Sequence, residues 1–377
     1  MLNVTDSLNL HHKLRGKLSI QSKIRLNTRK NLSLAYTPGV AEAVRNIYIN
    51  KNALYDLTIK NNTIAVVTDG SAVLGLGNVG PEAALPVMEG KCAIFKEFAD
   101  INAFPICLTT QDTEEIIRTI KNIAPVFGGI NLEDISAPRC FEIEKRLQKK
   151  LEIPVMHDDQ HATTIVVLAG LINAVKIVNK NLKTVKIVIN GCGAAGTAIA
   201  KLLNYYGIKN LIILDSQGII SSKRNDLTVY KKELVKITNP ENISGNLDRA
   251  VIDADILIGV SVKNIFTKKI IQSMNPEPIV FALANPDPEV TPANARKWGV
   301  KVIATGRSDY PNQINNALVF PGFFKGLLEN RITKITDETK IKAAIALAGL
   351  IKKPAQNHII PSIFDKRVVT TIVSAIT

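Results

Sequence analysis

Two pairs of adjacent carboxylates stand where short apolar runs end. Glu133-Asp134 follows VFGGINL, and Asp158-Asp159 follows IPVMH. Neighbouring carboxylates disfavour joint ionisation unless a cation neutralises them, and oxygen ligands of this kind suit Mg²⁺ or Mn²⁺. The alternative is that they cap helices, with Asp134 or Ser136 before APRCFEIEKRL and Asp159 before QHATTIVVL. Spacing alone leaves a metal site and helix caps equally open.

Two further side chains are candidates for proton transfer. Lys91 lies in the largely apolar segment LPVMEGKCAIFKEF. Apolar surroundings disfavour an ammonium ion, so this segment predicts a lysine that can act as a neutral base. Tyr36 lies in SLAYTPGV, before a Thr-Pro-Gly turn, where a phenol can donate a proton or simply pack. The residues alone also allow a lysine that merely extends its charge to solvent.

A glycine fingerprint of dinucleotide-binding proteins, G-x-G-x-x-G, begins at Gly191. It follows the apolar run VKIVIN and opens the helical stretch AAGTAIAKLLNYY, and LIILD then places Asp215 24 residues beyond Gly191. Such a strand, turn and helix bring backbone amides to a pyrophosphate, and the acidic residue accepts from the ribose hydroxyls. The alternative is a plain strand-to-helix turn rich in small residues. The expected cofactor contacts are Gly191, Gly193, Ala194, Ala195, Gly196 and Asp215.

The same glycine pattern also occurs at Gly75, Gly77 and Gly80, but DGSAVL precedes it and Pro81 follows. We expect a loop before a helix that starts at the proline, in a structural role at least as much as a cofactor-binding one.

The residues after Asp215 bear on the choice of cofactor. Ser216 comes next, and no Arg or Lys appears before Lys223. A 2′-phosphate usually needs a nearby cation, so the sequence favours NAD, with NADP possible.

Parallel sheets with crossover helices are the elements expected to position these residues, because short β-branched runs alternate with helical stretches. Strands are expected at 64–68, 104–108, 126–130, 153–156, 185–189, 211–214, 256–260, 279–283 and 300–304. Thr113 is placed to cap a helix that begins TEEIIRTI. An apolar helix at about 161–178 joins two strand-helix series. We therefore expect two α/β domains: 1–160 for substrate and metal, and 161–377 as a Rossmann-type NAD-binding domain.

Composition limits the partners. The chain has 377 residues, of which 46% are hydrophobic and 21% charged, as is typical of a globular protein of two domains. Its net charge is +14, yet residues 61–160 hold 9 basic and 15 acidic side chains. The segment with the acidic pairs is therefore itself acidic, which argues against a nucleic-acid-binding stripe and for a pocket that requires a cation.

Cysteine use and hydropathy bear on the compartment. Four cysteines are too few and too far apart for a disulfide framework or a zinc motif. The segment MLNVTDSLNLHHKLRGK has no apolar core of a secretory signal, and the longest apolar stretch, 165–172, is too short to span a bilayer. We expect a cytoplasmic protein with no membrane partner.

Taken together, these segments resemble malic enzyme of the short prokaryotic type. The resemblance runs from about residue 15 to the end of the chain and rests on ordered motifs: AYTPGV, TDGSAVLGLGNVG, PVMEGK, NLEDI, HDDQHAT, GCGAAG, LDSQG, FALANPD and NNALVFPG. It implies an enzyme that uses a divalent metal and a nicotinamide cofactor to convert (S)-malate to pyruvate and CO₂. It also implies a homodimer.

The resemblance further implies a role for each matching residue. Tyr36 is expected to be the general acid, Lys91 the general base, and Asp158 a carboxylate beside that lysine. The implied metal ligands are Glu133, Asp134 and Asp159, and the implied substrate contacts are Asn285 and Asn316.

One departure and two rival functions remain. The loop at 71–73 reads Ser-Ala-Val and has no arginine where longer relatives place a substrate-binding one, so the group facing the malate carboxylate is open. A methylene-tetrahydrofolate dehydrogenase also has a tyrosine and a lysine beside a Rossmann domain, but it lacks a metal site. A basic nucleic-acid-binding protein is disfavoured because the chain lacks zinc-finger spacing and aromatics make up only 5% of it.

Overall fold

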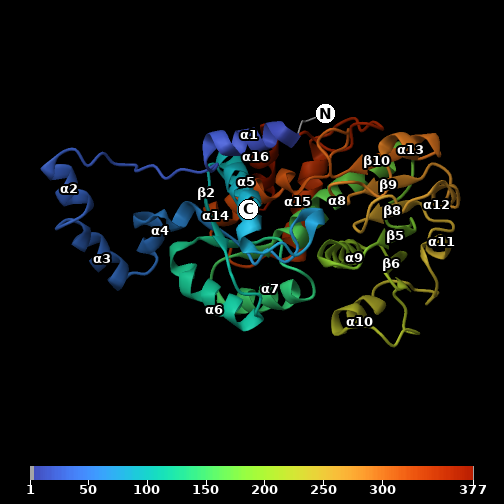
Figure 1. The fold of residues 1–377 in the computed structure, drawn as a ribbon, viewed down its shortest axis with the longest axis horizontal. Coiled ribbons are helices and arrows are strands. Elements are labelled where there is room, and N and C mark those ends of the chain that lie inside the picture. The colour runs from blue at the N-terminus through green and yellow to red at the C-terminus, as the bar shows by residue number, and fades with distance from the viewer. Residues whose placement is uncertain (1–3, 377) are drawn as a thin grey trace.

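The computed structural model describes residues 4–376 and contains two separate sheets, shown in Figure 1. The first sheet has the strand order β2-β1-β3-β4, and all its pairings are parallel. Its strands are β1 (Thr63–Thr68), β2 (Asn102–Cys107), β3 (Gly129–Leu132) and β4 (Val155–His157). Every residue of β1, β3 and β4 is buried, as expected for a parallel sheet covered on both faces.

The second sheet has the strand order β10-β9-β8-β5-β6-β7. Its strands are β5 (Ile187–Asn190), β6 (Leu211–Asp215), β7 (Gly218–Ile219), β8 (Ile256–Gly259), β9 (Ile279–Ala282) and β10 (Val302–Thr305). Taken in chain order, this is the arrangement of dinucleotide-binding folds, in which the order reverses between β5 and β8. The short β7 pairs antiparallel with β6. The expected fold class, α/β with a Rossmann-type second domain, is confirmed.

Each expected strand forms, with shifts at the ends. The largest shift is at the third strand, because Val126 lies in the short 3-10 helix Ala124–Val126 and the strand starts only at Gly129. Pro125 favours that turn because it lacks an amide hydrogen and has a fixed φ. The two-residue β7 was not expected.

Helix α6 (Thr113–Ile123) corrects another expectation. Its N-cap is Asp112, whose carboxylate accepts a hydrogen bond from the Glu115 amide at 2.9 Å. Thr113 is instead the first helical residue. Asp112 caps because its backbone is extended, which turns the carboxylate back to an amide without an intrahelical partner.

Helix α8 (Asp158–Ile177) connects the two sheets. It packs against α9 (Ala194–Tyr206) and α15 (Asp337–Gly349), and the Asn173 amide donates to the carbonyls of Ala348 and Ile359, each at 2.9 Å. Its length and hydropathy would allow it to cross a membrane, although the apolar stretch predicted from the sequence looked too short. However, 72% of its most apolar window is buried inside the protein, so its hydrophobicity is explained by the core.

The C-terminal helices return to the first domain. Helix α14 (Phe320–Glu329) packs against α5 (Pro81–Ala99) and α16 (Arg367–Ala375). The Phe95 ring lies 4.7 Å from the Phe320 ring and 5.5 Å from the Phe324 ring, measured between centroids. The boundary near residue 160 stays a prediction, and these contacts show that the first core is completed by residues far beyond it.

The remaining helices lie around these layers. They are α1 (Val4–Leu14), α7 (Arg139–Lys150), α10 (Val229–Val235), α11 (Leu247–Ala250), α12 (Lys268–Gln272) and α13 (Pro292–Lys297).

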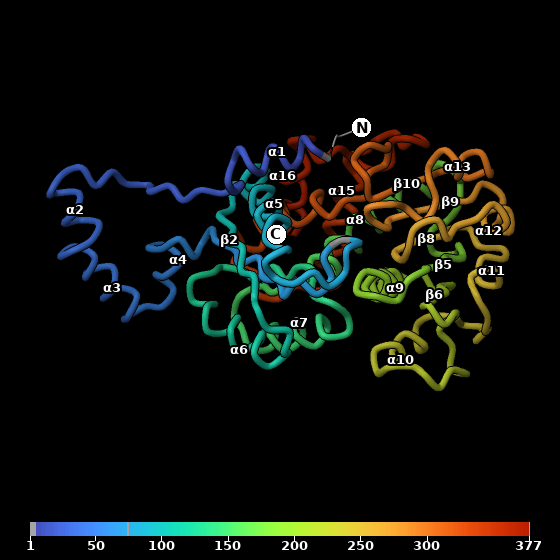
Figure 2. Tube along the Cα trace, viewed as in Figure 1, coloured from blue at the N-terminus to red at the C-terminus, as the bar shows by residue number. Residues whose placement is uncertain are grey.

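An arm of three helices projects from the first domain. It consists of α2 (Arg29–Ala35), α3 (Val40–Ile49) and α4 (Ala53–Leu57), and Figure 2 shows α2 and α3 well apart from both sheets. No residue of these helices is buried. Helix α3 exposes even its apolar side chains Val40, Val44 and Tyr48. Within residues 4–376, the exposed apolar side chains of α3 therefore have no core to pack into.

Candidate functional site

A cavity of about 610 Å³ lies where the two domains face each other. Segments that follow β3, β5, β8, β9 and β10 line it, so the carboxyl ends of strands from both sheets meet there, as is usual for ligand sites of α/β proteins. The predicted site residues among its lining are Lys91, Glu133, Asp134, Asp159, Ala195, Asn285 and Asn316.

Three carboxylates gather at one wall of this cavity. One oxygen from each of Glu133, Asp134 and Asp159 lies within 4.8 Å of the others. Glu133 and Asp134 follow β3 directly, and Asp159 lies in the first turn of α8, after β4. Asp134 has a φ of +53°, a left-handed conformation that Asp tolerates better than most residues and that is common at functional sites.

The electrostatics of this wall favour a bound cation. Burial raises the pKa of Glu133 well above its ordinary value; Lys91 opposes the shift, whereas Asp158, Asp159 and Asp134 add to it. A divalent cation would relieve this repulsion, and three carboxylate oxygens are the hard donors that Mg²⁺ and Mn²⁺ prefer. The donor set therefore fits a divalent metal.

The alternative that these carboxylates cap helices is wrong. The N-cap of α7 is Pro138, and that of α8 is His157; neither makes a side-chain capping hydrogen bond. The Asp159 carboxylate instead accepts from the Asp134 amide at 3.0 Å, which ties the two acidic segments together across neighbouring strands.

Lys91 lies on α5 and points at the acidic wall rather than at apolar side chains alone. Its Nζ donates to Glu133 Oε1 at 2.9 Å and to Asp158 Oδ2 at 2.6 Å, and lies 4.0 Å from the centre of the Phe320 ring. Burial alone lowers the pKa of Lys91, but the Asp158 and Glu133 carboxylates raise it above its ordinary value. The expectation of an apolar environment that lowers this pKa is therefore wrong.

Asp158 lies beside Lys91, as expected, and is fully buried. Asn316 donates to the same oxygen of Asp158, so its amide is directed at that carboxylate while also lining the cavity. Asn285 lines the cavity from the opposite domain, after β9. Among the described residues that line this cavity, Lys91 is the single cation, and no arginine takes the place of the one absent from residues 71–73.

The fingerprint at Gly191 has the expected conformation. Gly191 follows β5 with a φ of +121°, and a Cβ there would lie 2.5 Å from the Val260 carbonyl oxygen. A Cβ on Gly196 would lie 1.8 Å from the Gly191 carbonyl oxygen, whereas one on Gly193 would meet nothing within 4 Å. Gly191 and Gly196 are thus required by the turn, and Gly193 faces open space beside the amino end of α9. This geometry suits a pyrophosphate.

Asp215, the last residue of β6, is where the sequence predicts it, but its surroundings differ. Arg224 Nη1 donates to its Oδ1 at 2.7 Å, and Lys231 donates to its Oδ2. The premise that no cation lies near this carboxylate is wrong, because a loop and helix α10 bring back residues 9 and 16 positions later.

The loop with the first glycine pattern makes a contact between the domains. A Cβ on Gly75 would lie only 2.0 Å from the Asn285 carbonyl oxygen. Gly80 precedes α5, which begins at Pro81 as expected. Gly75 therefore serves close packing between the two halves of the cavity.

Tyr36 is a predicted catalytic residue that the structure does not bring to the cavity of its own chain. It ends α2 in the projecting arm, and 67% of its surface is exposed. It does not line the cavity.

Sequence reasoning missed two neighbours of the acidic wall. Asn131 donates to Glu133 Oε2 at 2.8 Å, and its place two residues earlier in the chain, on the same face of the sheet, could have revealed it. Phe320, whose ring faces Lys91, comes from a distant helix and left no local signal.

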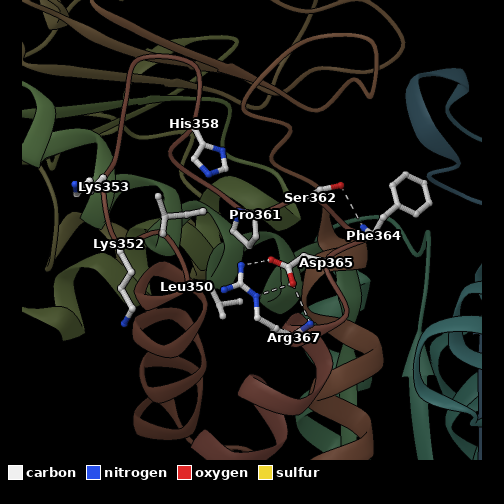
Figure 3. Close-up of a pocket in the computed structure, with 10 residues that line it drawn as sticks. Leu350, Lys352, Lys353, His358, Pro361, Ser362, Phe364, Asp365 and Arg367 are labelled. Atoms are coloured by element: carbon white, nitrogen blue, oxygen red, sulfur yellow. Dashed lines mark hydrogen bonds and ion pairs between the residues drawn. The ribbon is translucent and has the colours of Figure 1, made fainter.

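A second cavity, of about 690 Å³, lies near the carboxyl terminus (Figure 3). Lys352, Lys353 and His358 line it, and Arg367 is paired with Asp365 at 2.7 Å. None of the predicted site residues lies there, so the cavity between the domains is the candidate active site.

Two family descriptions match nearly the whole chain: "Malic enzyme, N-terminal domain" at residues 15–148 and "Malic enzyme, NAD binding domain" at residues 161–376. The chain is 51% identical to a bifunctional malic/malolactic enzyme of Bacillus subtilis, over 98% of this chain and 91% of that protein. It is 52% identical to an NAD-dependent malic enzyme of Geobacillus stearothermophilus, over 100% and 79%.

Solved structures give the same result. The crystal structure of an NAD-dependent malic enzyme from Thermotoga maritima matches with a TM-score of 0.95 and 47% identity, covering 100% of this chain and 99% of that one. These matches exclude the methylene-tetrahydrofolate dehydrogenase family as the assignment of this chain. With both domains matched in order, the chain belongs to the malic enzyme family.

Proposed function

We propose that this chain oxidatively decarboxylates (S)-malate to pyruvate and CO₂, with reduction of NAD or NADP and dependence on a divalent metal, and that it also decarboxylates oxaloacetate. One observation carries the proposal: Lys91 contacts the Glu133 and Asp158 carboxylates in a cavity whose other walls come from the dinucleotide-binding domain. A proton acceptor, a cation site and a hydride acceptor site are thus adjacent.

In this proposal Glu133, Asp134 and Asp159 hold the metal. A bound cation would supply polarisation of the malate oxygens, and a bound nicotinamide would supply the acceptor for hydride from C2. The chain's own residues then handle protons. Lys91 takes the proton of the C2 hydroxyl, and Asp158 and Asn316 hold the lysine in position. A cation held by Glu133 would offset the negative charge that this carboxylate presents to Lys91, which would favour a neutral lysine.

Tyr36 is proposed to donate the proton to C3 after CO₂ leaves. Because it lies on the exposed arm of its own chain, it can do so only in the cavity of another copy. The exposed apolar residues of α3 support an assembly in which two arms are exchanged. We therefore propose a homodimer in which each site combines Lys91 of one chain with Tyr36 of its partner.

A mixing experiment tests this arrangement. Lys91→Ala and Tyr36→Phe are each expected to be inactive alone. Unfolded together and refolded, they should recover activity at about a quarter of the sites, since half of the dimers are mixed and one site in each is intact. No recovery in verified mixed dimers would contradict the exchange, and activity of Tyr36→Phe alone would contradict the tyrosine's role.

The assay that tests the central proposal follows reduced cofactor at 340 nm. Malate is supplied with NAD or with NADP, each with Mn²⁺ or with EDTA, and pyruvate is quantified at the end. We expect reduced cofactor and pyruvate only with the metal. No reduced cofactor in any condition would refute the proposed reaction, and full activity in EDTA would refute the metal site.

The proposal also covers the compartment and the partners of the enzyme. We propose a cytoplasmic enzyme whose partners are a small acid and a second copy of itself. The four free cysteines and the buried α8 support this placement.

A further inference from the structure

Glu289 is a buried carboxylate behind the wall that the second domain contributes to the cavity. It is fully buried. Its Oε1 accepts from Ser261 N at 2.9 Å, and its Oε2 accepts from Ala284 N at 3.0 Å. Ser261 and Ala284 line the cavity after β8 and β9, whereas Glu289 does not. One carboxylate thus joins two of the segments that form this wall.

The fold leaves room for this carboxylate at the end of β8. A Cβ on Gly259, the last residue of that strand, would lie 2.4 Å from Glu289 Cδ. The main chain of Glu289 is held as well, because its carbonyl accepts from Phe266 N at 3.0 Å. The position of the carboxylate therefore depends on the glycine at 259, since a side chain there would displace it.

Glu289 has no positively charged partner among residues 4–376. Burial raises its pKa, and the Ser261 and Ala284 amides oppose this rise by donating to the ionised form. A buried carboxylate without a cation lowers stability, and costly groups of this kind are typical of functional sites. The place of Glu289 behind the cavity wall indicates which function it serves.

Asn190 extends this connection to the cofactor loop. It is the last residue of β5, directly before the glycine fingerprint, and its side-chain amide donates to Ser261 Oγ at 2.8 Å. On the other side, Ala284 directly precedes Asn285, the proposed contact of malate. Through these contacts Glu289 links the cofactor loop to the proposed substrate contact.

We propose that Glu289 is a positioning residue for hydride transfer. By accepting from two backbone amides, it fixes the segment after β8, on the cofactor side of the cavity, relative to Asn285. The inference rests on the proposed function and adds to it a residue that does not itself line the cavity. Misplacing reacting groups by about 1 Å can slow a reaction about 100-fold, so a group behind the wall can control the rate.

Glu289→Gln tests this proposal because it keeps the shape of the side chain but not both acceptors. An amide has one acceptor oxygen, so its NH₂ group must face the N–H of either Ser261 or Ala284, and one hydrogen bond breaks. Hydrogen–deuterium exchange of the protein without ligands should show at least one of these two amides exchanging about tenfold faster. In a single turnover with malate, Mn²⁺ and the cofactor that the wild type reduces faster, formation of reduced cofactor should be about tenfold slower or more.

Two further measurements separate positioning from binding. Malate deuterated at C2 should slow the single turnover of Glu289→Gln further, which identifies the affected step as hydride transfer. The fluorescence of the bound reduced cofactor should give a dissociation constant within about threefold of the wild-type value, because each segment keeps its own contacts. Thermal unfolding verifies that the variant is folded.

Two further variants keep the test specific. Asp255, directly before the same strand β8, also accepts from a backbone amide, Lys186 N, at 2.9 Å, but it does not line the cavity. Asp255→Asn should lower stability and leave the single-turnover rate within about twofold, because it acts at the opposite end of β8. Gly259→Ala leaves Glu289 in place but presses on its carboxylate. It should slow the turnover as Glu289→Gln does, and it supplies the test if the glutamine variant does not fold.

The contrary outcomes are distinct. If a folded Glu289→Gln keeps a near-normal single-turnover rate, or if its loss is not sensitive to deuterium or is explained by weaker cofactor binding alone, the inference is wrong while the proposed reaction stands. A loss of the same size in Asp255→Asn would show that any weakening of this sheet slows the reaction, which also contradicts the inference. If the wild type forms no reduced cofactor from malate, the proposed function itself fails.

Discussion

Two carboxylates at the ends of each sheet have pKa values shifted in opposite directions from one sheet to the other. At the first sheet, burial and like charges raise the pKa values of Glu133 and Asp158. At the second, burial also acts to raise the pKa values of Asp215 and Asp255, but lysine, arginine and backbone donors outweigh it, and both are lowered. The first group thus lowers the stability of the chain when the proposed cation is absent, whereas the second adds to stability.

Substituting the lysine that is paired with each group of carboxylates tests this difference most strongly. Lys91→Ala removes the proposed base and should lower kcat for malate by about 10³-fold or more. Lys180, which donates to Asp255 Oδ1 at 2.8 Å, is the matched control in the second domain. Lys180→Met should leave kcat within about twofold of the wild-type value, because the Lys180–Asp255 pair contributes to the stability of the fold and not to the reaction.

Near-normal turnover of Lys91→Ala with malate would contradict the assignment of the base. A large loss of kcat in Lys180→Met would contradict the division between a reactive group and a stabilising one. Circular dichroism of both variants checks that they are folded.

Neutralising a proposed metal ligand should stabilise the metal-free protein. Asp134→Asn keeps the size of the side chain, tolerates the positive φ, and removes one of the mutually repelling charges. We expect the melting temperature in EDTA to rise by a few degrees, about 1 kcal/mol, while the stabilisation by Mn²⁺ seen in the wild type is lost. Calorimetry with and without Mn²⁺ measures both, and a lower melting temperature in EDTA would show that the cluster is not under repulsion.

The corresponding change in the second sheet should have the opposite sign. Asp255 also accepts from Lys186 N at 2.9 Å and from Asn275, and its folded-state pKa is lowered. Its contribution is therefore complete above its unfolded pKa of about 4 and disappears as the pH falls through the lower folded value.

Asp255→Asn should accordingly lose about 1 kcal/mol of unfolding free energy at pH 7, and the difference from the wild type should shrink as the pH approaches 3. Urea unfolding at several pH values measures it. A difference that grows on acidification would reverse the sign that the hydrogen bonds predict.

Much of this arrangement could be predicted from the sequence, because local signals carry it. The β-branched runs predicted the positions of the strands, and the glycine fingerprint with Asp215 predicted the position of the cofactor loop. The two acidic pairs follow the adjacent strands β3 and β4. Because these strands are parallel, both pairs lie at the same edge of the sheet, and their proximity could be predicted.

Long-range packing decided what could not be predicted. The pKa of Lys91 depends on Asp158, which is 67 residues away, and Asp215 is surrounded by Arg224 and Lys231, which a loop brings back. The place of Tyr36 on an exposed arm is a property of the tertiary fold, and no motif around AYTPGV encodes it.

The contact of Gly75 with the backbone of Asn285 has a consequence for how this enzyme can diversify. Because Gly75 has no side chain, its main chain can lie against the Asn285 carbonyl at this contact between the domains. Substitutions elsewhere in the cavity lining can alter which acid fits without changing how far apart the halves stand. Any side chain at position 75 would instead act as a wedge, widening the gap across which hydride has to travel.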